Sequence, residues 1–102
     1  MNIQMKKVTI VAERLLKEQV LDLLKKQGAT GYTLTACEGE GSRGVNASDW
    51  EGRNIQVETI VDPETADNIL DRVCSAFTEH YAVIAFHCDV TVRRKSKFSP
   101  PK

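Results

Sequence analysis

The sequence predicts an α+β fold, a ferredoxin-like βαββαβ sandwich in which two helices pack on a four-stranded antiparallel sheet. Short β-branched runs and two amphipathic helical patterns follow one another in the order strand, helix, strand, strand, helix, strand. A long glycine-rich loop, residues 39–53, separates the second predicted strand from the third. The 102 residues suit one domain. We predict this domain over residues 1–94, with residues 95–102 as a flexible basic C-terminal tail.

The first strand is predicted over residues 7–12, a β-branched run bounded by charged residues. A helical pattern then begins at Glu13 and stops at Gly28, because glycine commonly terminates helices. The apolar residues of this helix recur at helical spacing and predict its buried stripe. They are Leu16, Val20, Leu23 and Leu24.

The next two strands are predicted over residues 31–37 and 54–61, because side-chain character alternates along both segments. The second helix is predicted to begin at Asp62 and Pro63, since a carboxylate N-cap followed by proline is a favoured helix opening. Its buried stripe is predicted to be Ala66, Ile69, Leu70, Val73 and Phe77. The last strand is predicted over residues 82–93.

Two helices can cover only one face of a four-stranded sheet, so the other face must meet water or another subunit. We expect this open face to be largely polar, and we favour an oligomer seam because the last strand is long for a small domain. The residues predicted on it are Thr33, Thr35, Asn54, Gln56, Glu58, Val83, Ala85, His87, Asp89 and Arg93.

The amino-acid composition disfavours several classes of function. The 14 basic and 14 acidic side chains balance, so no net field favours nucleic acid or an anionic membrane. No apolar run resembles a signal peptide or a membrane span, and we expect a cytoplasmic protein without membrane insertion. Cys37, Cys74 and Cys88 lack the spacing of a zinc site. We expect them to be buried thiols that pack as small hydrophobes.

The chemistry of the long loop is concentrated in residues 39–44, Gly-Glu-Gly-Ser-Arg-Gly. Glycines allow backbone N–H groups to turn toward an anion, and Ser42 and Arg43 add a hydroxyl and a planar guanidinium. A flexible hairpin connection with a solvated arginine is the alternative interpretation.

The sequence shows no Ser/His/Asp or Cys/His arrangement that is typical of a nucleophilic enzyme. No catalytic residue is therefore predicted, and a non-enzymatic function is favoured. His87 and Asp89 are two residues apart on the last predicted strand and are interpreted as a polar pair. Glu38 and Glu40 are interpreted either as metal-binding carboxylates or as loop charge. RNA recognition is disfavoured, because residues 55–57 lack the aromatic side chains that stack on bases.

Two motifs carry a resemblance to a known family. The run Gly-Ala-Thr-Gly-Tyr-Thr at residues 28–33 and the run Gly-Glu-Gly-Ser-Arg at residues 39–43 resemble the PII superfamily of trimeric signalling proteins. In particular, they are similar to the PII-like branch that includes carboxysome-associated PII proteins and regulators of sodium-dependent bicarbonate transporters. The similarity extends over nearly the whole chain, from the opening residues 8–11 to Tyr81 and Ala82.

The resemblance implies a homotrimer that binds adenine nucleotides between neighbouring subunits, at the base of a mobile T-loop that corresponds to residues 39–53. The ligands in this branch are AMP, ADP, ATP or cyclic AMP, with bicarbonate as a second candidate ligand. We expect ADP or AMP here. Ligand-dependent ordering of the T-loop would control its contact with a partner, and the associated physiology is inorganic-carbon uptake through a membrane bicarbonate transporter.

The resemblance also implies functional residues. Tyr32 and Thr33 match positions near the base and ribose, and Arg43 matches a phosphate clamp, a role that suits a guanidinium. Trp50 would suit partner contact, or would fold back on the domain. The complete implied nucleotide-binding set is Tyr32, Thr33, Gly39, Gly41, Ser42, Arg43, Val83 and Ile84.

The sequence departs from the family in three places. It lacks a glycine-rich B-loop before the last strand, the T-loop tyrosine that is uridylylated in nitrogen-regulatory PII proteins, and the C-terminal paired cysteines of some transporter regulators. Classical 2-oxoglutarate sensing, glutamine-synthetase control and redox control are therefore not expected. The alternatives are a divalent-metal-binding trimer of the same fold, a slow nucleotide hydrolase and an amino-acid-sensing module of ferredoxin-like fold.

Overall fold

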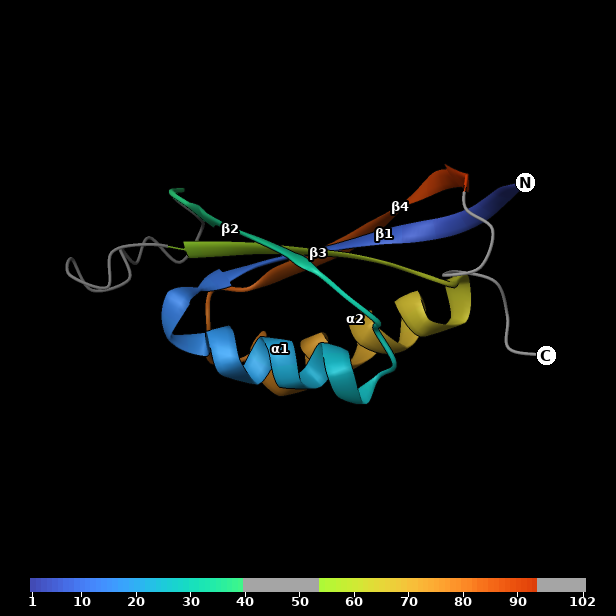
Figure 1. Cartoon of the computed structure of the whole chain (residues 1–102). Coiled ribbons are helices and arrows are strands. Elements are labelled where there is room, and N and C mark those ends of the chain that lie inside the picture. The colour runs from blue at the N-terminus through green and yellow to red at the C-terminus, as the bar shows by residue number, and fades with distance from the viewer. Residues whose placement is uncertain (40–53, 94–102) are drawn as a thin grey trace.

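The computed structural model describes residues 1–39 and 54–93, and its elements follow the predicted order. The strands form one antiparallel sheet in the order β2-β3-β1-β4, and both α-helices lie on the same face of it (Figure 1). The ferredoxin-like prediction is thus confirmed. The elements are β1 (Asn2–Glu13), the 3-10 turn η1 (Arg14–Leu16), α1 (Lys17–Lys26), β2 (Thr33–Cys37), β3 (Asn54–Val61), α2 (Pro63–Phe77) and β4 (Ile84–Arg93).

β1 is longer than predicted because β4 pairs with its whole N-terminal half. The predicted start at residue 7 is wrong: the ladder between the two strands runs from Asn2 opposite Arg93 to Val11 opposite Ile84. Two polar rungs support this ribbon. Gln4 Nε2 donates to Thr91 Oγ1 at 3.0 Å, and Arg93 Nε donates to the Asn2 side-chain oxygen at 3.1 Å. These partners are far away in sequence, so the local pattern around residues 2–6 could not reveal them.

The first helix also begins later than predicted. Glu13 still belongs to β1, and η1 precedes α1, which starts at Lys17 without a side-chain cap. The predicted stop is confirmed. Gly28 has a φ of 99°, a conformation that favours glycine, and the Ala29 N–H donates to the Leu24 carbonyl at 3.0 Å.

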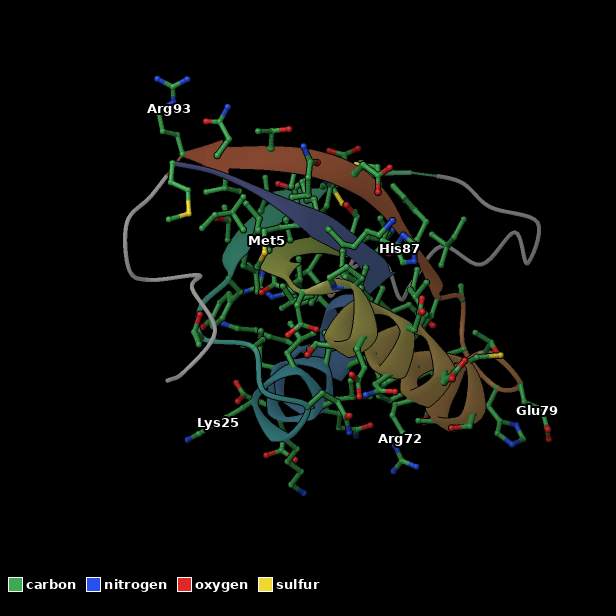
Figure 2. All side chains as sticks on the ribbon, turned by 90° about the vertical axis from the view of Figure 1, so that its right-hand side faces the viewer. Met5, Lys25, Arg72, Glu79, His87 and Arg93 are labelled. Carbon is green, nitrogen blue, oxygen red and sulfur yellow. The ribbon has the colours of Figure 1, made fainter. Side chains whose placement is uncertain are left out.

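α2 begins as predicted. The Asp62 carboxylate accepts a hydrogen bond of 2.7 Å from the Thr65 N–H, and Pro63 occupies the first turn. Four of the five apolar residues predicted for its inner stripe are buried, and Leu70 is half-buried. Figure 2 shows Arg72 projecting away from the sheet, as predicted for a solvated position. β2 and β4 each begin two residues later than predicted.

The hydrophobic core fills the space between the sheet and the helices. β1 contributes Val8, Ile10 and Ala12 from its C-terminal half, and each of these side chains is almost completely buried. Opposite them lie buried side chains of both helices and of η1. The remaining core residues are Leu16, Val20, Leu24, Ile55, Val57, Val61, Ala66, Ile69, Val73 and Phe77.

The side chains that β4 presents on the open face of the sheet are apolar, contrary to the prediction. Ladder pairs place His87 beside Val8 and Ala85 beside Ile10, so these β4 residues lie on the face that the helices cover. The prediction was therefore wrong for Val83, Ala85, His87, Asp89 and Arg93. Period-2 alternation separates two sets of side chains, but only the register with β1 decides which set faces the helices. The open face of β4 instead presents Ile84, Phe86, Cys88, Val90 and Val92.

The prediction of three buried thiols was also wrong. Cys37 is half-buried, whereas Cys74 and Cys88 are exposed. Cys74 lies outside the buried stripe of α2, and Cys88 lies on the open sheet face. Over the described parts of the chain, neither α1 nor α2 has the length and apolar character needed to cross a membrane.

Candidate functional site

An open hollow of about 210 Å³ lies where β2 begins and β3 ends. Its wall includes Tyr32 and Thr33, the two residues assigned by resemblance to base and ribose. Tyr32 is 55% exposed, so its ring is available to pack against a ligand or another subunit. The full lining is Lys7, Thr30, Gly31, Tyr32, Thr33, Glu58, Thr59 and Ile60.

A partly buried hydrogen bond joins two residues in the wall of this hollow. Thr59 is only 3% exposed, and its Oγ1 donates to the Gly31 carbonyl at 2.6 Å. The bond ties the segment between α1 and β2 to β3. Because that segment lies outside any ladder before Thr33, this tie holds the backbone that leads into Tyr32.

Two charged side chains lie in the lining, and neither was predicted from the sequence to contact a ligand. Lys7 Nζ on β1 lies 3.5 Å from Glu58 Oε2 on β3, and Gln56 Nε2 donates to the same oxygen at 3.3 Å. Lys7 and Glu58 are not directly paired in the ladder but lie on the same open face. The antiparallel register was therefore needed to bring Lys7 to Tyr32. From the sequence alone, the alternation within β3 indicates only which face of that strand carries Glu58.

The remaining described site residues lie elsewhere. Gly39 follows the far end of β2, where Asn54 Nδ2 would lie 3.9 Å from a Cβ at the glycine position. Val83 and Ile84 lie at the start of β4, which is separated from β3 by β1. Within one chain, Tyr32 and Thr33 therefore lie apart from Gly39, Val83 and Ile84.

Four residues of the predicted site lie outside the described residues. They are Gly41, Ser42, Arg43 and Trp50. The phosphate-clamp and partner-contact roles of these residues stay predictions.

The start of β4 has an internal hydrogen-bond arrangement that no local sequence pattern predicts. The Ala82 N–H donates to Glu13 Oε2 at 3.2 Å, and the Val83 N–H donates to the Tyr81 carbonyl at 3.0 Å. Neither N–H is therefore free to bind a ligand in this conformation. Ile84 offers an apolar side chain, 59% exposed, rather than a polar contact.

Metal-ligating side chains do not gather in the part of the chain that the structure describes. Among residues 1–39 and 54–93, no three His, Cys, Asp or Glu side chains are placed to hold one ion. His87 contacts Asp67, and Asp89 contacts Lys6, so His87 and Asp89 do not form the polar pair that their spacing suggested.

Comparison with known proteins gives the family. A model of the nitrogen regulatory protein P-II family matches residues 5–97. A PII-like signalling protein from Thermus thermophilus is 48% identical, with a TM-score of 0.83, and the match covers 96% of this chain and 98% of that one.

CPII from Thiomonas intermedia, a nitrogen regulatory PII-like protein, is also similar. A CPII structure bound to ADP, AMP and acetate is 29% identical with a TM-score of 0.83, and the match covers 96% of this chain and 97% of CPII. A CPII structure bound to ADP, AMP and bicarbonate is 29% identical with a TM-score of 0.80, and the match covers 93% of this chain and 99% of CPII. With the family model matched over residues 5–97, this chain belongs to the nitrogen regulatory protein P-II family.

Proposed function

We propose that this chain forms a homotrimeric PII-like regulatory protein that senses adenine nucleotides. The observation that carries the proposal is the hollow at Tyr32 and Thr33, in a chain whose relative CPII has been crystallised with ADP and AMP. The base and ribose lie in this hollow, and ADP or AMP is the preferred nucleotide. The protein acts by binding rather than by catalysis.

The separation of the predicted site residues supports an intersubunit site. Gly39 and the Tyr32–Thr33 pair flank opposite ends of β2, so a second copy completes the site. The apolar open face of β4 offers the surface for that association: Ile84 is 59% exposed and Phe86 is 47% exposed. In the trimer, the base and ribose occupy the hollow of one copy. Gly41, Ser42 and Arg43 of the neighbouring copy bind the phosphate of that nucleotide.

We further propose that the T-loop, residues 39–53, becomes ordered on nucleotide binding and thereby changes its contact with a partner. CPII has been crystallised with bicarbonate as well as nucleotide, which supports bicarbonate as a second ligand. The proposed physiology is regulation of inorganic-carbon uptake linked to carboxysomes in the cytoplasm. The proposed partner is a membrane bicarbonate transporter, with Trp50 as a contact. Residues 1–94 form the binding domain and residues 95–102 a flexible tail.

Calorimetric titration with AMP, ADP, ATP and cyclic AMP, with and without bicarbonate, tests this function. We expect micromolar binding of ADP or AMP at about one ligand per chain, and a trimeric mass by light scattering. Arg43→Ala should weaken binding by about 1.5–3 kcal/mol, the range for a hydrogen bond to a charged group. Arg72→Ala, at an exposed position on α2, is the matched control. If none of the four nucleotides bound, the proposal would be disproved.

A further inference from the structure

The connection between α2 and β4 is closed to anions by its own hydrogen bonds. The N–H groups of residues 80–83 all donate within the chain. The carbonyls of Phe77 and Tyr81 accept from three of them, and the Glu13 carboxylate accepts from Ala82. An anion that approached this backbone would find no free donor among these four groups and would meet a carboxylate.

Glu13 lies at the end of the sheet where the loop of residues 39–53 begins. It is paired with Asn54 across the β1–β3 ladder, and Asn54 is paired with Cys37 across the β3–β2 ladder. Gly39 follows shortly after Cys37 and adjoins the Asn54 side chain. Glu13 is therefore a half-buried carboxylate at the base of this loop.

The charge of Glu13 has no compensating partner in residues 1–39 and 54–93. The ion pairs within those ranges involve other acidic side chains: Glu58, Glu79, Asp22, Asp67 and Asp89. The hydrogen bond from Ala82 N–H orients the carboxylate but does not neutralise it. A neighbouring phosphate would be repelled, and partial burial makes such repulsion stronger than in bulk water.

We infer that Glu13 is a specificity-determining residue that disfavours nucleotides with long phosphate chains. The inference rests on the proposed nucleotide function, in which Gly39 and the start of β4 lie toward the phosphate end of the ligand. Each added phosphate brings more negative charge toward Glu13 and finds no free N–H donor in residues 80–83. AMP, whose single phosphate stays closer to the ribose, is affected least, and ATP is affected most.

The test is calorimetric titration of AMP, ADP and ATP, in the absence of Mg²⁺, into the wild type and Glu13→Gln. Glutamine removes the charge and keeps an oxygen that can accept from Ala82. We expect the ATP affinity to rise on the order of tenfold relative to that of AMP, equivalent to about 1.4 kcal/mol. The control is Glu18→Gln, which removes a carboxylate in the first turn of α1. This variant should leave the ratio of ATP affinity to AMP affinity unchanged.

Amide hydrogen exchange provides a second readout that does not involve nucleotide. The Ala82 amide should be protected in the wild type and in Glu13→Gln, and should exchange faster in Glu13→Ala. The inference would be overturned if the ratio of ATP affinity to AMP affinity were the same in the wild type and in Glu13→Gln. An unprotected Ala82 amide in the wild type would also overturn it. A wild type that binds none of the nucleotides would instead disprove the proposed function, and this inference with it.

Discussion

His87 on β4 and Asp67 on α2 form a contact of 3.2 Å between Nε2 and Oδ1. The His87 side chain is 24% exposed and the Asp67 side chain 73% exposed, so the pair sits at the rim of the helical layer. Figure 2 shows His87 close to the α2 ribbon. The contact links β4 to α2 and keeps an imidazole on the helix-covered side of the sheet, while Phe86 faces the open side.

The first prediction concerns the strength of this contact. Asp67→Asn should lower the free energy of unfolding by no more than about 1 kcal/mol, because solvent screens exposed pairs. Urea denaturation of Asp67→Asn, His87→Gln and the double variant would give the coupling energy. Asp71→Asn, one turn later on α2 at an exposed position, is the control and should change stability very little. A coupling well above this range would show that the pair is a structural requirement rather than a rim contact.

The second prediction concerns Asp89 and pH. The Lys6 ammonium, through a hydrogen bond and its charge, holds the pKa of the Asp89 carboxyl below its ordinary value of 3.8, and the charge of His87 acts in the same direction. A depressed folded-state pKa contributes stability that is present above the unfolded value and is lost as pH falls through the folded value. Urea denaturation should therefore show that the advantage of wild type over Asp89→Asn is constant near neutrality and shrinks below about pH 3.8.

The Lys6→Gln background is the control for this titration. Without the ammonium, Asp89→Asn should produce little change in the pH dependence of unfolding. Because the Asp89 side chain is largely exposed, the effect should be small at every pH. An advantage of the wild type that persists undiminished at acid pH would contradict the assignment.

The third prediction concerns association through the open face. Phe86→Glu should convert the proposed trimer to monomer, because a carboxylate buried in an apolar interface loses hydration without gaining a partner. Light scattering after size-exclusion chromatography measures the mass directly. Ser75→Glu adds the same charge at an exposed position of α2 and should leave the trimer intact. A Phe86→Glu trimer of unchanged stability would place the interface elsewhere.

The fourth prediction concerns the wall of the hollow. Thr59→Val should lower the free energy of unfolding by about 1–3 kcal/mol, because it leaves the Gly31 carbonyl without its 2.6 Å hydrogen bond. It should also weaken nucleotide binding, because the backbone leading to Tyr32 loses its tie to β3. Thermal unfolding and calorimetry measure the two effects. Thr91→Val, at an exposed position of the β1–β4 ribbon, is the control and should preserve nucleotide affinity.

Much of the fold could be predicted because its signals are local. Asp62 and Pro63 mark the start of α2 through hydrogen-bonding groups only three residues apart, and Gly28 marks the end of the first helix through its own φ. Residues 54–61 alternate strictly, and their predicted bounds agree with β3. The Gly-Ala-Thr-Gly-Tyr-Thr motif identified two residues that lie in the lining of the hollow.

The candidate site could be predicted only in part, because its members meet across ladders. Lys7 reaches the hollow through the register of β1 with β3, and Glu13 reaches Ala82, which is 69 residues away in sequence. No local spacing encodes either contact. Similarly, alternation in the last strand distinguished His87 from Phe86 but did not show which of them faces the helices.

The order of the elements, the ends marked by Asp62 and Gly28, and the motifs that point to the P-II family can be read from the amino-acid sequence alone. These depend on interactions within a few residues, whose energetics are nearly independent of the rest of the chain. The full length of β1, the apolar character of the open face of β4 and the hydrogen bond between Glu13 and Ala82 arise from the three-dimensional packing of the chain. These depend on strand register, which is set by packing the whole sheet against two helices.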